Sequence, residues 1–177
     1  MPTTLKKSQL KDCIRDVPDF PKEGIIFKDI TTLLKDKAAL KKSINLLAGK
    51  FKKQNIQAVV GVEARGFIFG AAIAYKLGCG FIPIRKKGKL PYKTRSVSYE
   101  LEYGTDILEI HEDAIEPGTR VLVVDDLLAT GGTIKAVVEL LRQQKAVIAG
   151  VAFLVELKFL KGISKLKDLQ VYSVLKF

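Results

Sequence analysis

Two adjacent acids followed by a Thr-Gly-Gly-Thr turn, between residues 125 and 133, are the part of the chain whose residue types most directly predict chemistry. Asp125 and Asp126 end an apolar run, Val121 to Val124, that is typical of a strand buried on both faces of a parallel sheet. After Thr133 the apolar residues take helical spacing. The turn therefore joins the carboxyl end of a strand to the amino end of a helix, where open α/β sheets bind their ligands.

Such a helix start collects free backbone N–H groups and the positive end of the helix dipole, and glycines let the backbone close around a phosphate. Asp125 and Asp126 would repel a phosphate, so we expect them to face either vicinal sugar hydroxyls or a metal ion. This arrangement predicts a ribose 5-phosphate site; the alternative is that the acids merely cap the helix and the glycines form an ordinary turn. The predicted phosphate-binding residues are Ala129, Thr130, Gly131, Gly132 and Thr133.

The composition favours one α/β domain. A chain of 177 residues, 47% of them hydrophobic, is long enough for one well-buried domain and short for two, so we expect a single domain over residues 1 to 177. No apolar run approaches the ~20 residues of a membrane helix, and the polar, lysine-bearing start does not resemble a secretory signal. Cys13 and Cys79 form no Cys-x-x-Cys pair, which favours a reducing compartment. We therefore expect a cytoplasmic protein that does not bind membranes.

The net charge of +11 raises the possibility of a nucleic-acid partner. The lysines are scattered, with little aromatic interleaving and no nucleic-acid module signature, so a solvated lysine-rich surface is favoured over nucleic-acid binding. One cluster differs, because it falls in a predicted loop and would suit a highly anionic sugar diphosphate. Its members are Arg85, Lys86, Lys87 and Lys89.

The remaining pattern alternates strands and helices, as in a mostly parallel sheet flanked by helices. Asp36 is predicted to cap a helix, and Pro83 indicates an edge or an end of its strand. A further helix carries Ile68, Ala71, Ala72 and Tyr75 on one face. The predicted strands are residues 58 to 62, 81 to 85, 121 to 124, 147 to 155 and 171 to 175, the predicted hairpin arms are 96 to 101 and 106 to 110, and a short helix spans 159 to 166.

The loop from Val123 to Thr133 resembles the phosphoribosyl-diphosphate loop of the type I phosphoribosyltransferases, in particular their adenine-specific members. Four other segments occur in the order of that family and spread over nearly the whole chain: Asp19 to Ile30, Glu63 to Phe67, Ile84 to Pro91 and Leu101 to Gly104. The resemblance implies the type I phosphoribosyltransferase fold, an α/β fold with a mostly parallel central sheet, an N-terminal hood segment and a β-hairpin lid.

The activity that the resemblance implies is transfer of the 5-phosphoribosyl group of 5-phosphoribosyl 1-diphosphate to adenine, which gives AMP and diphosphate in purine salvage. A 6-oxopurine acceptor is one alternative. A regulator that senses phosphoribosyl diphosphate and binds nucleic acid is another, although residues before Asp19 leave little room for a DNA-binding domain.

The resemblance also implies roles for residues around the sugar. Asp125 and Asp126 would accept hydrogen bonds from the ribose hydroxyls and favour the cationic sugar that forms as diphosphate departs. Mg²⁺ is the implied cofactor, without an identified protein ligand. Arg85, Lys86 and Lys89 reach the diphosphate from the neighbouring subunit in relatives, so a homodimer is expected. The implied diphosphate-binding residues are Glu63, Ala64, Arg65, Arg85, Lys86 and Lys89.

Base recognition and proton transfer are implied by the resemblance alone. Phe27 would stack on adenine opposite Leu157, and the backbone of Ile26 and Lys28 would bind the base edge. Lys28 replaces an arginine expected in many relatives, so only its backbone role is retained. Glu102 is the implied general acid/base, with Asp125 as its rival, and Tyr103 would help to close the lid. The only histidine, His111, is interpreted as a surface residue at a strand end.

Overall fold

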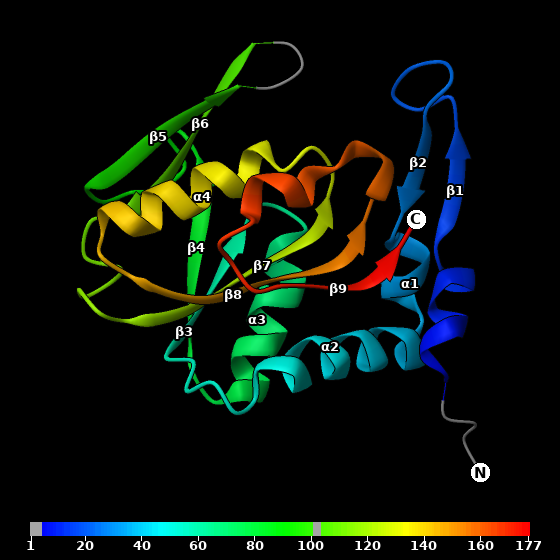
Figure 1. Ribbon diagram of the computed structural model, residues 1–177, viewed down its shortest axis with the longest axis horizontal. Helices are drawn as coiled ribbons and strands as arrows, with labels where there is room; N and C mark the ends of the chain where they lie inside the picture. The colour runs from blue at the N-terminus through cyan, green and yellow to red at the C-terminus, as the bar shows by residue number, and fades with distance from the viewer. Residues whose placement is uncertain (1–4, 101–103) are drawn as a thin grey trace. The chain divides into compact units, whose positions relative to one another are not determined.

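The computed structural model describes residues 5–100 and 104–177 (Figure 1). The chain divides between Leu46 and Leu47 into two compact units, an N-terminal unit and a larger C-terminal unit. The expectation that all residues form one domain stays a prediction.

The N-terminal unit is a small hairpin with short helices. β1 (Arg15–Pro18) and β2 (Ile26–Asp29) pair antiparallel. The Oδ1 atom of Asp36 accepts hydrogen bonds from the backbone N–H groups of Ala38 and Ala39, at 2.9 and 2.8 Å, so the predicted cap is confirmed. The helical elements are the 3₁₀ helix η1 (Lys7–Cys13), α1 (Thr31–Lys35) and α2 (Lys37–Phe51), the last of which continues into the C-terminal unit.

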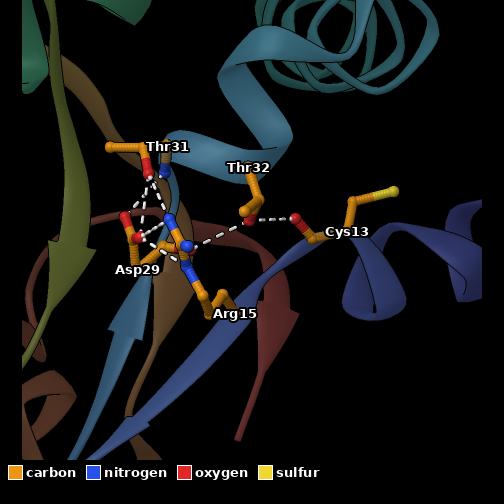
Figure 2. Close-up of polar contacts among 5 residues, drawn as sticks. All are labelled: Cys13, Arg15, Asp29, Thr31 and Thr32. Carbon is orange, nitrogen blue, oxygen red and sulfur yellow. Dashed lines mark hydrogen bonds and ion pairs between the residues drawn. The ribbon is translucent and has the colours of Figure 1, made fainter.

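A carboxylate ties β2 to its neighbours (Figure 2). Asp29 accepts hydrogen bonds from the backbone N–H and the hydroxyl of Thr31, at 2.9 and 2.8 Å, and from the guanidinium of Arg15, at 2.7 and 3.0 Å. Next to it, the Thr32 hydroxyl donates to the Cys13 carbonyl at 2.7 Å. The hydrogen bonds from Thr31, and then that from Arg15, lower the pKa of Asp29 to about 2. The end of β2 is therefore held in place by a charge-assisted network.

The C-terminal unit is built on a seven-stranded sheet with the strand order β5-β6-β4-β3-β7-β8-β9. Pairing from β4 through β3, β7 and β8 to β9 is parallel, and the β5 and β6 hairpin joins β4 antiparallel. The mostly parallel sheet and the hairpin are thus confirmed. The elements are β3 (Ala58–Val62), α3 (Gly66–Leu77), β4 (Gly80–Lys86), β5 (Thr94–Glu100), β6 (Thr105–His111), β7 (Arg120–Leu128), α4 (Gly132–Gln143), β8 (Val147–Glu156), η2 (Lys158–Leu160), η3 (Gly162–Leu166) and β9 (Val171–Lys176).

Pro83 marks neither an edge strand nor the end of its strand, so the prediction made from it is wrong. β4 lies between two strands, so it is not an edge strand. Pro83 pairs with Gly61 of β3, however, and the ladder to β6 begins two residues later, at Arg85. The missing N–H of proline therefore falls on a stretch where β6 does not pair with β4.

The face of α3 that carries Ile68, Ala71, Ala72 and Tyr75 is not the face that packs in the core. Ile68 is 43% exposed and Tyr75 is 90% exposed, whereas Phe69 and Ile73 are fully buried. Glycines allow this close packing, because a Cβ atom on Gly70 would lie 2.7 Å from the ring of Phe81. In α4, by contrast, the predicted apolar stripe forms part of the core, as Ile134, Val137, Val138 and Leu141 are all buried.

His111 is less exposed than the sequence predicts. It ends β6, as expected, but its ring is half-buried and its Nε2 atom has no hydrogen-bond partner among the described residues. The ring of Tyr92 lies beside it, with the two centroids 6.1 Å apart in an edge-to-face arrangement. Within the described part of the chain, no helix combines the length and apolarity needed to cross a membrane.

The Asp29 network predicts a pH-dependent contribution to stability. Because the folded-state pKa is lowered to about 2, the contribution is fully present above the unfolded pKa of about 3.9 and is lost as the pH falls through about 2. Asp29→Asn should lower the melting temperature at pH 7 by a few degrees, and this deficit should shrink toward pH 2. Thermal unfolding followed by circular dichroism measures both.

Asp16→Asn is the matched control for Asp29→Asn. Asp16 lies on the partner strand, is exposed and forms an ion pair with Lys28 at 2.6 Å. Exposed ion pairs contribute little, so its loss should shift the melting temperature less. Equal shifts for the two variants at pH 7 would contradict a special role for Asp29.

Candidate functional site

Asp125 and Asp126 lie toward the carboxyl end of β7, with an arginine from a neighbouring element. The Oδ1 atom of Asp125 accepts a hydrogen bond from the backbone N–H of Asp126 at 2.8 Å. Nε of Arg65, the residue that precedes α3, lies 2.8 Å from Oδ2 of Asp126. The fold therefore brings together three predicted site residues from two strand-to-helix turns.

The two acids have unusual protonation energetics. Burial, and then the charge of Asp126, raise the pKa of Asp125 well above its ordinary value. Burial also raises the pKa of Asp126, although the positive charge of Arg65 opposes this effect. A cation or a set of hydroxyl donors placed beside Asp125 would be stabilised by its carboxylate, and this is what a developing cationic sugar requires.

A glycine brings the start of α3 close to the acids. A Cβ atom on Gly66 would lie 2.8 Å from Oδ1 of Asp125 and 3.0 Å from the carbonyl oxygen of Val124. A larger residue would have to displace the strand or the carboxylate. The glycine of the Glu-Ala-Arg-Gly turn thus serves packing at the acid pair, which the sequence motif alone did not reveal.

The predicted phosphate loop has the geometry expected for an anion site. It runs from Ala129 to Thr133, and α4 begins at Gly132 after Gly131, whose φ of 77° is left-handed. A small cavity of about 70 Å³ lies against the loop and the carboxyl end of β7. Free N–H groups at a helix start next to such a cavity can bind a phosphate.

The predicted diphosphate residues form ion pairs within the chain. Arg85 binds Glu63 with Nε 2.8 Å from the carboxylate, and Lys89 binds the other oxygen of Glu63. Burial alone would raise the pKa of Glu63, but hydrogen bonds from Lys89 and Arg85 outweigh it and lower the pKa. Ala64 is exposed, and its peptide bond with Glu63 is cis. The structure brings Glu63, Arg85 and Lys89 together, separately from the ion pair of Arg65.

Lys86 points to a different partner. Its Nζ atom lies 2.8 Å from Asp106, on the neighbouring hairpin strand, and this hydrogen bond raises the pKa of Lys86 and lowers that of Asp106. The Tyr99 hydroxyl lies 3.5 Å from the same carboxylate. Burial, and then the charge of Asp106, raise the pKa of Tyr99, against a hydrogen bond from Thr133. Tyr99 thus connects the hairpin to the phosphate loop, a link that sequence spacing did not reveal.

The predicted adenine residues fall in both units. In the N-terminal unit, Ile26 is 56% exposed and Phe27 packs edge-to-face on Phe20, with ring centroids 5.2 Å apart. The Lys28 side chain pairs with Asp16. In the C-terminal unit, the Leu157 backbone N–H donates to the carbonyl of Leu128 at the end of β7, at 2.9 Å. Glu102 and Tyr103 lie outside the described residues.

A larger cavity of about 530 Å³ lies between the hairpin and α4. It shares Gly132 with the phosphate loop, but neither Asp125 nor Arg65 lines it. Asp125 and the predicted phosphate loop line the smaller cavity of about 70 Å³ instead. The lining of the larger cavity includes Ser98, Tyr99, Thr105, Lys135, Glu139 and Lys165.

The side chains available as metal ligands determine how a magnesium ion could be bound. Among residues 5–100 and 104–177, no three histidine, cysteine, aspartate or glutamate side chains converge on one metal position. Glu63 and Asp126 are already paired with cations. These residues fit an ion held mainly by substrate phosphates and water, which is how Mg²⁺ is usually bound.

The fold and site are those of a phosphoribosyltransferase. Residues 29–176 match the family model described as phosphoribosyl transferase domain, and the chain belongs to this family. The adenine phosphoribosyltransferase of Acidobacterium capsulatum is 60% identical over 95% of this chain and 93% of that protein. That of Clostridium kluyveri is 57% identical over 95% of this chain and 98% of that protein.

Solved structures agree. The crystal structure of adenine phosphoribosyltransferase from Thermoanaerobacter pseudethanolicus matches 97% of this chain and all of that chain, with a TM-score of 0.94 and 51% identity. The enzyme from Saccharomyces cerevisiae, solved with an imino-altritol bisphosphate and adenine, covers 96% of this chain and 98% of its own, with a TM-score of 0.90 and 41% identity. The implied type I phosphoribosyltransferase fold is confirmed, and the chain groups with adenine phosphoribosyltransferases along nearly its whole length.

The raised pKa of Asp125 predicts that the acid pair costs stability. For an acid with a raised folded-state pKa, the cost is absent below the unfolded pKa of about 3.9 and develops as the pH rises. Asp125→Asn should therefore increase the melting temperature at pH 7, and the gain should vanish near pH 4. The amide oxygen can still accept the Asp126 N–H, so packing is kept. Calorimetry across this pH range gives the comparison.

Asp168→Asn provides the opposite control. Asp168 is exposed, and its hydrogen bond with Arg142 lowers its pKa. Neutralising it should leave stability at pH 7 unchanged or slightly reduced. A lower melting temperature for Asp125→Asn at pH 7 would show that the pair is not a stability cost.

Proposed function

We propose that this chain transfers the 5-phosphoribosyl group of 5-phosphoribosyl 1-diphosphate to adenine, forming AMP and diphosphate in purine salvage. The observation that carries the proposal is the acid pair at the end of β7 followed directly by the loop from Ala129 to Thr133 at the amino end of α4. An anion site and two carboxylates on consecutive residues match a sugar that carries both a 5′-phosphate and free hydroxyls. Relatives named adenine phosphoribosyltransferase support adenine as the acceptor.

In the proposed reaction, the phosphate loop fixes the sugar by its phosphate. Backbone N–H groups from Ala129 to Thr133 and the hydroxyls of Thr130 and Thr133 donate to the 5′-phosphate. Asp125 and Asp126 accept from the ribose hydroxyls. As the bond from the anomeric carbon to diphosphate breaks, positive charge develops on the sugar. The carboxylate of Asp125, whose pKa is raised by burial and by Asp126, stabilises that charge.

The leaving diphosphate is proposed to bind the turn from Glu63 to Arg65 together with cations near the end of β4. Arg85 and Lys89 are held by Glu63, and Lys86 by Asp106, so these cations exchange a carboxylate for diphosphate oxygens. In a homodimer they would act on the neighbouring subunit. A Mg²⁺ ion bound with the substrate would neutralise part of the charge of the leaving diphosphate.

The acceptor base is proposed to stack on Phe27, with the backbone of Ile26 and Lys28 at its edge and Leu157 on its other face. Ile26 is exposed, which leaves its backbone accessible. The ion pair of Lys28 with Asp16 occupies the lysine side chain, which favours a backbone role at this position. The adenine-type segment from Asp19 to Ile30 favours adenine over a 6-oxopurine.

Proton transfer at the base is assigned to Glu102, with Tyr103 helping to close the lid. The competing assignment is Asp125. General acid/base groups contribute roughly 10²–10⁴-fold to the rate. Glu102→Gln should therefore lower kcat with little change in KM for phosphoribosyl diphosphate, as measured by steady-state kinetics. A near-normal kcat for Glu102→Gln would move the role to Asp125.

The exposed apolar face of α3 supports a homodimer. Ile68, Ala71 and Tyr75 share this face, and α3 directly follows the proposed diphosphate turn. A second copy packed there would bury these side chains next to the turn that needs cations from its partner. Sedimentation velocity should show a dimer, and Tyr75→Glu should dissociate it while Lys76→Glu, at the adjacent exposed position, should not. A monomeric unmodified protein at micromolar concentration would rule out the homodimer.

A reducing compartment, the cytoplasm, is proposed from the cysteines. Cys13 and Cys79 are both free thiols in the structure, and burial raises the pKa of each. Thiols of this kind react slowly and suit a compartment without disulfide formation. Trapping thiols in intact cells with a maleimide should label both positions after denaturation, and an oxidised pair would oppose this assignment.

The proposed function is tested by product analysis with purified protein. Adenine and 5-phosphoribosyl 1-diphosphate with Mg²⁺ should give AMP and diphosphate, resolved by chromatography, whereas hypoxanthine should give little IMP. Asp125→Asn should lose at least ~10²-fold in kcat, the size found when one group that stabilises transition-state charge is removed. Turnover of 6-oxopurines alone would refute the choice of adenine, and full activity in Asp125→Asn would refute its role.

A further inference from the structure

The back of the phosphate loop is formed by a backbone segment about thirty positions further along the chain. Gly162, the first residue of η3, is buried. A Cβ atom built on it would lie 2.1 Å from the carbonyl oxygen of Ala129 and 2.9 Å from the amide nitrogen of Gly131. Both of these atoms belong to the loop that is proposed to hold the 5′-phosphate.

The contact is reciprocal. A Cβ atom on Gly131 would lie 2.6 Å from the carbonyl oxygen of Gly162. Gly131 also has a left-handed φ of 77°, so two requirements select glycine there, whereas Gly162 has only the close approach. Two glycines therefore let two stretches of main chain touch without intervening side chains.

The segment that carries Gly162 is itself anchored. Leu166, at the end of η3, is buried in the same core cluster as Ile134 and Val137 of α4. Lys161, just before Gly162, has a left-handed φ of 53° and closes η2. η3 is thus fixed to the helix whose amino end carries the phosphate loop, and it cannot easily move away from the loop.

We infer that Gly162 is a positioning residue for the 5′-phosphate, and that η3 acts as a rigid wall that sets the direction of the Gly131 amide. This inference rests on the proposed function, since it assigns the loop amides to the phosphate of the sugar substrate. A side chain at position 162 would collide with the carbonyl oxygen of Ala129 and the amide nitrogen of Gly131. These are backbone atoms, so they cannot rotate away as a side chain could. Misplacement of the amides would weaken phosphate binding while leaving the base site unaltered.

Gly162→Ala tests the inference through a split between Michaelis constants. KM for phosphoribosyl diphosphate should rise by ~10-fold or more, since shifts of about 1 Å in positioning groups cost up to 10²-fold, while KM for adenine should stay within about twofold. Gly49→Ala is the matched control, because a Cβ atom there meets nothing within 4 Å. Unchanged KM values, or an equal rise in both, would overturn the inference. A merely smaller folded fraction would lower the apparent kcat with both KM values unchanged, and this outcome also counts against it.

If Gly162→Ala fails to fold, a second measurement, on the unmodified protein, tests the role of Gly162. Hydrogen exchange with and without ribose 5-phosphate should show slower exchange in residues 129–133 and also in 161–164, because the wall and the loop move as one body. Protection confined to 129–133 would overturn the role of Gly162 and leave the proposed function intact. Absence of protection in both segments would instead refute the phosphate loop, and the role of Gly162 with it.

Discussion

The site depends on two adjacent carboxylates toward the end of β7, of which Asp126 is buried and Asp125 is partly exposed. Burial of adjacent acids is unfavourable, as the raised pKa of Asp125 and of Asp126 shows. Arg65 compensates one acid, and the backbone N–H of Asp126 compensates the other. Because this compensation is incomplete, the two carboxylates favour a ligand that brings hydrogen-bond donors or positive charge. The surrounding elements of the fold hold the two carboxylates in this arrangement.

The cations that are proposed to bind diphosphate form ion pairs with acids of the same chain. Glu63 binds Arg85 and Lys89, and Asp106 binds Lys86. Lys89 is exposed and Arg85 is partly exposed, but the Glu63 side chain is only 7% exposed, so withdrawal of both cations would leave a buried carboxylate unpaired. The large positive net charge of the chain therefore overstates the free charge at the site. In the proposed reaction, a diphosphate would compete with these carboxylates for the cations.

Features that depend on local periodicity could be predicted from the sequence. Features that depend on contacts between residues far apart in the sequence could not. Strand β3, the α4 stripe and the cap at Asp36 follow from spacing alone. The residue types of the phosphate loop are a local signature, and the strand and helix predicted on either side of the loop are confirmed. The orientation of α3 could not be predicted, because Gly70 and Phe81 pack it on a face that periodicity cannot distinguish from the other. The partners of Glu63 and Lys86, and the contact between Gly131 and Gly162, join residues far apart in sequence and leave no local pattern.

The segments proposed to recognise the base and the sugar phosphate are stabilised separately, each by contacts within its own unit. The strand with Ile26, Phe27 and Lys28 is fastened by Asp29 to Arg15 and Thr31, all within the N-terminal unit. The phosphate loop is fastened by Gly162 within the C-terminal unit. The contacts that hold β2 and those that hold the phosphate loop share no residue. The strand proposed to bind the base can therefore vary while the contacts of the phosphate loop are kept.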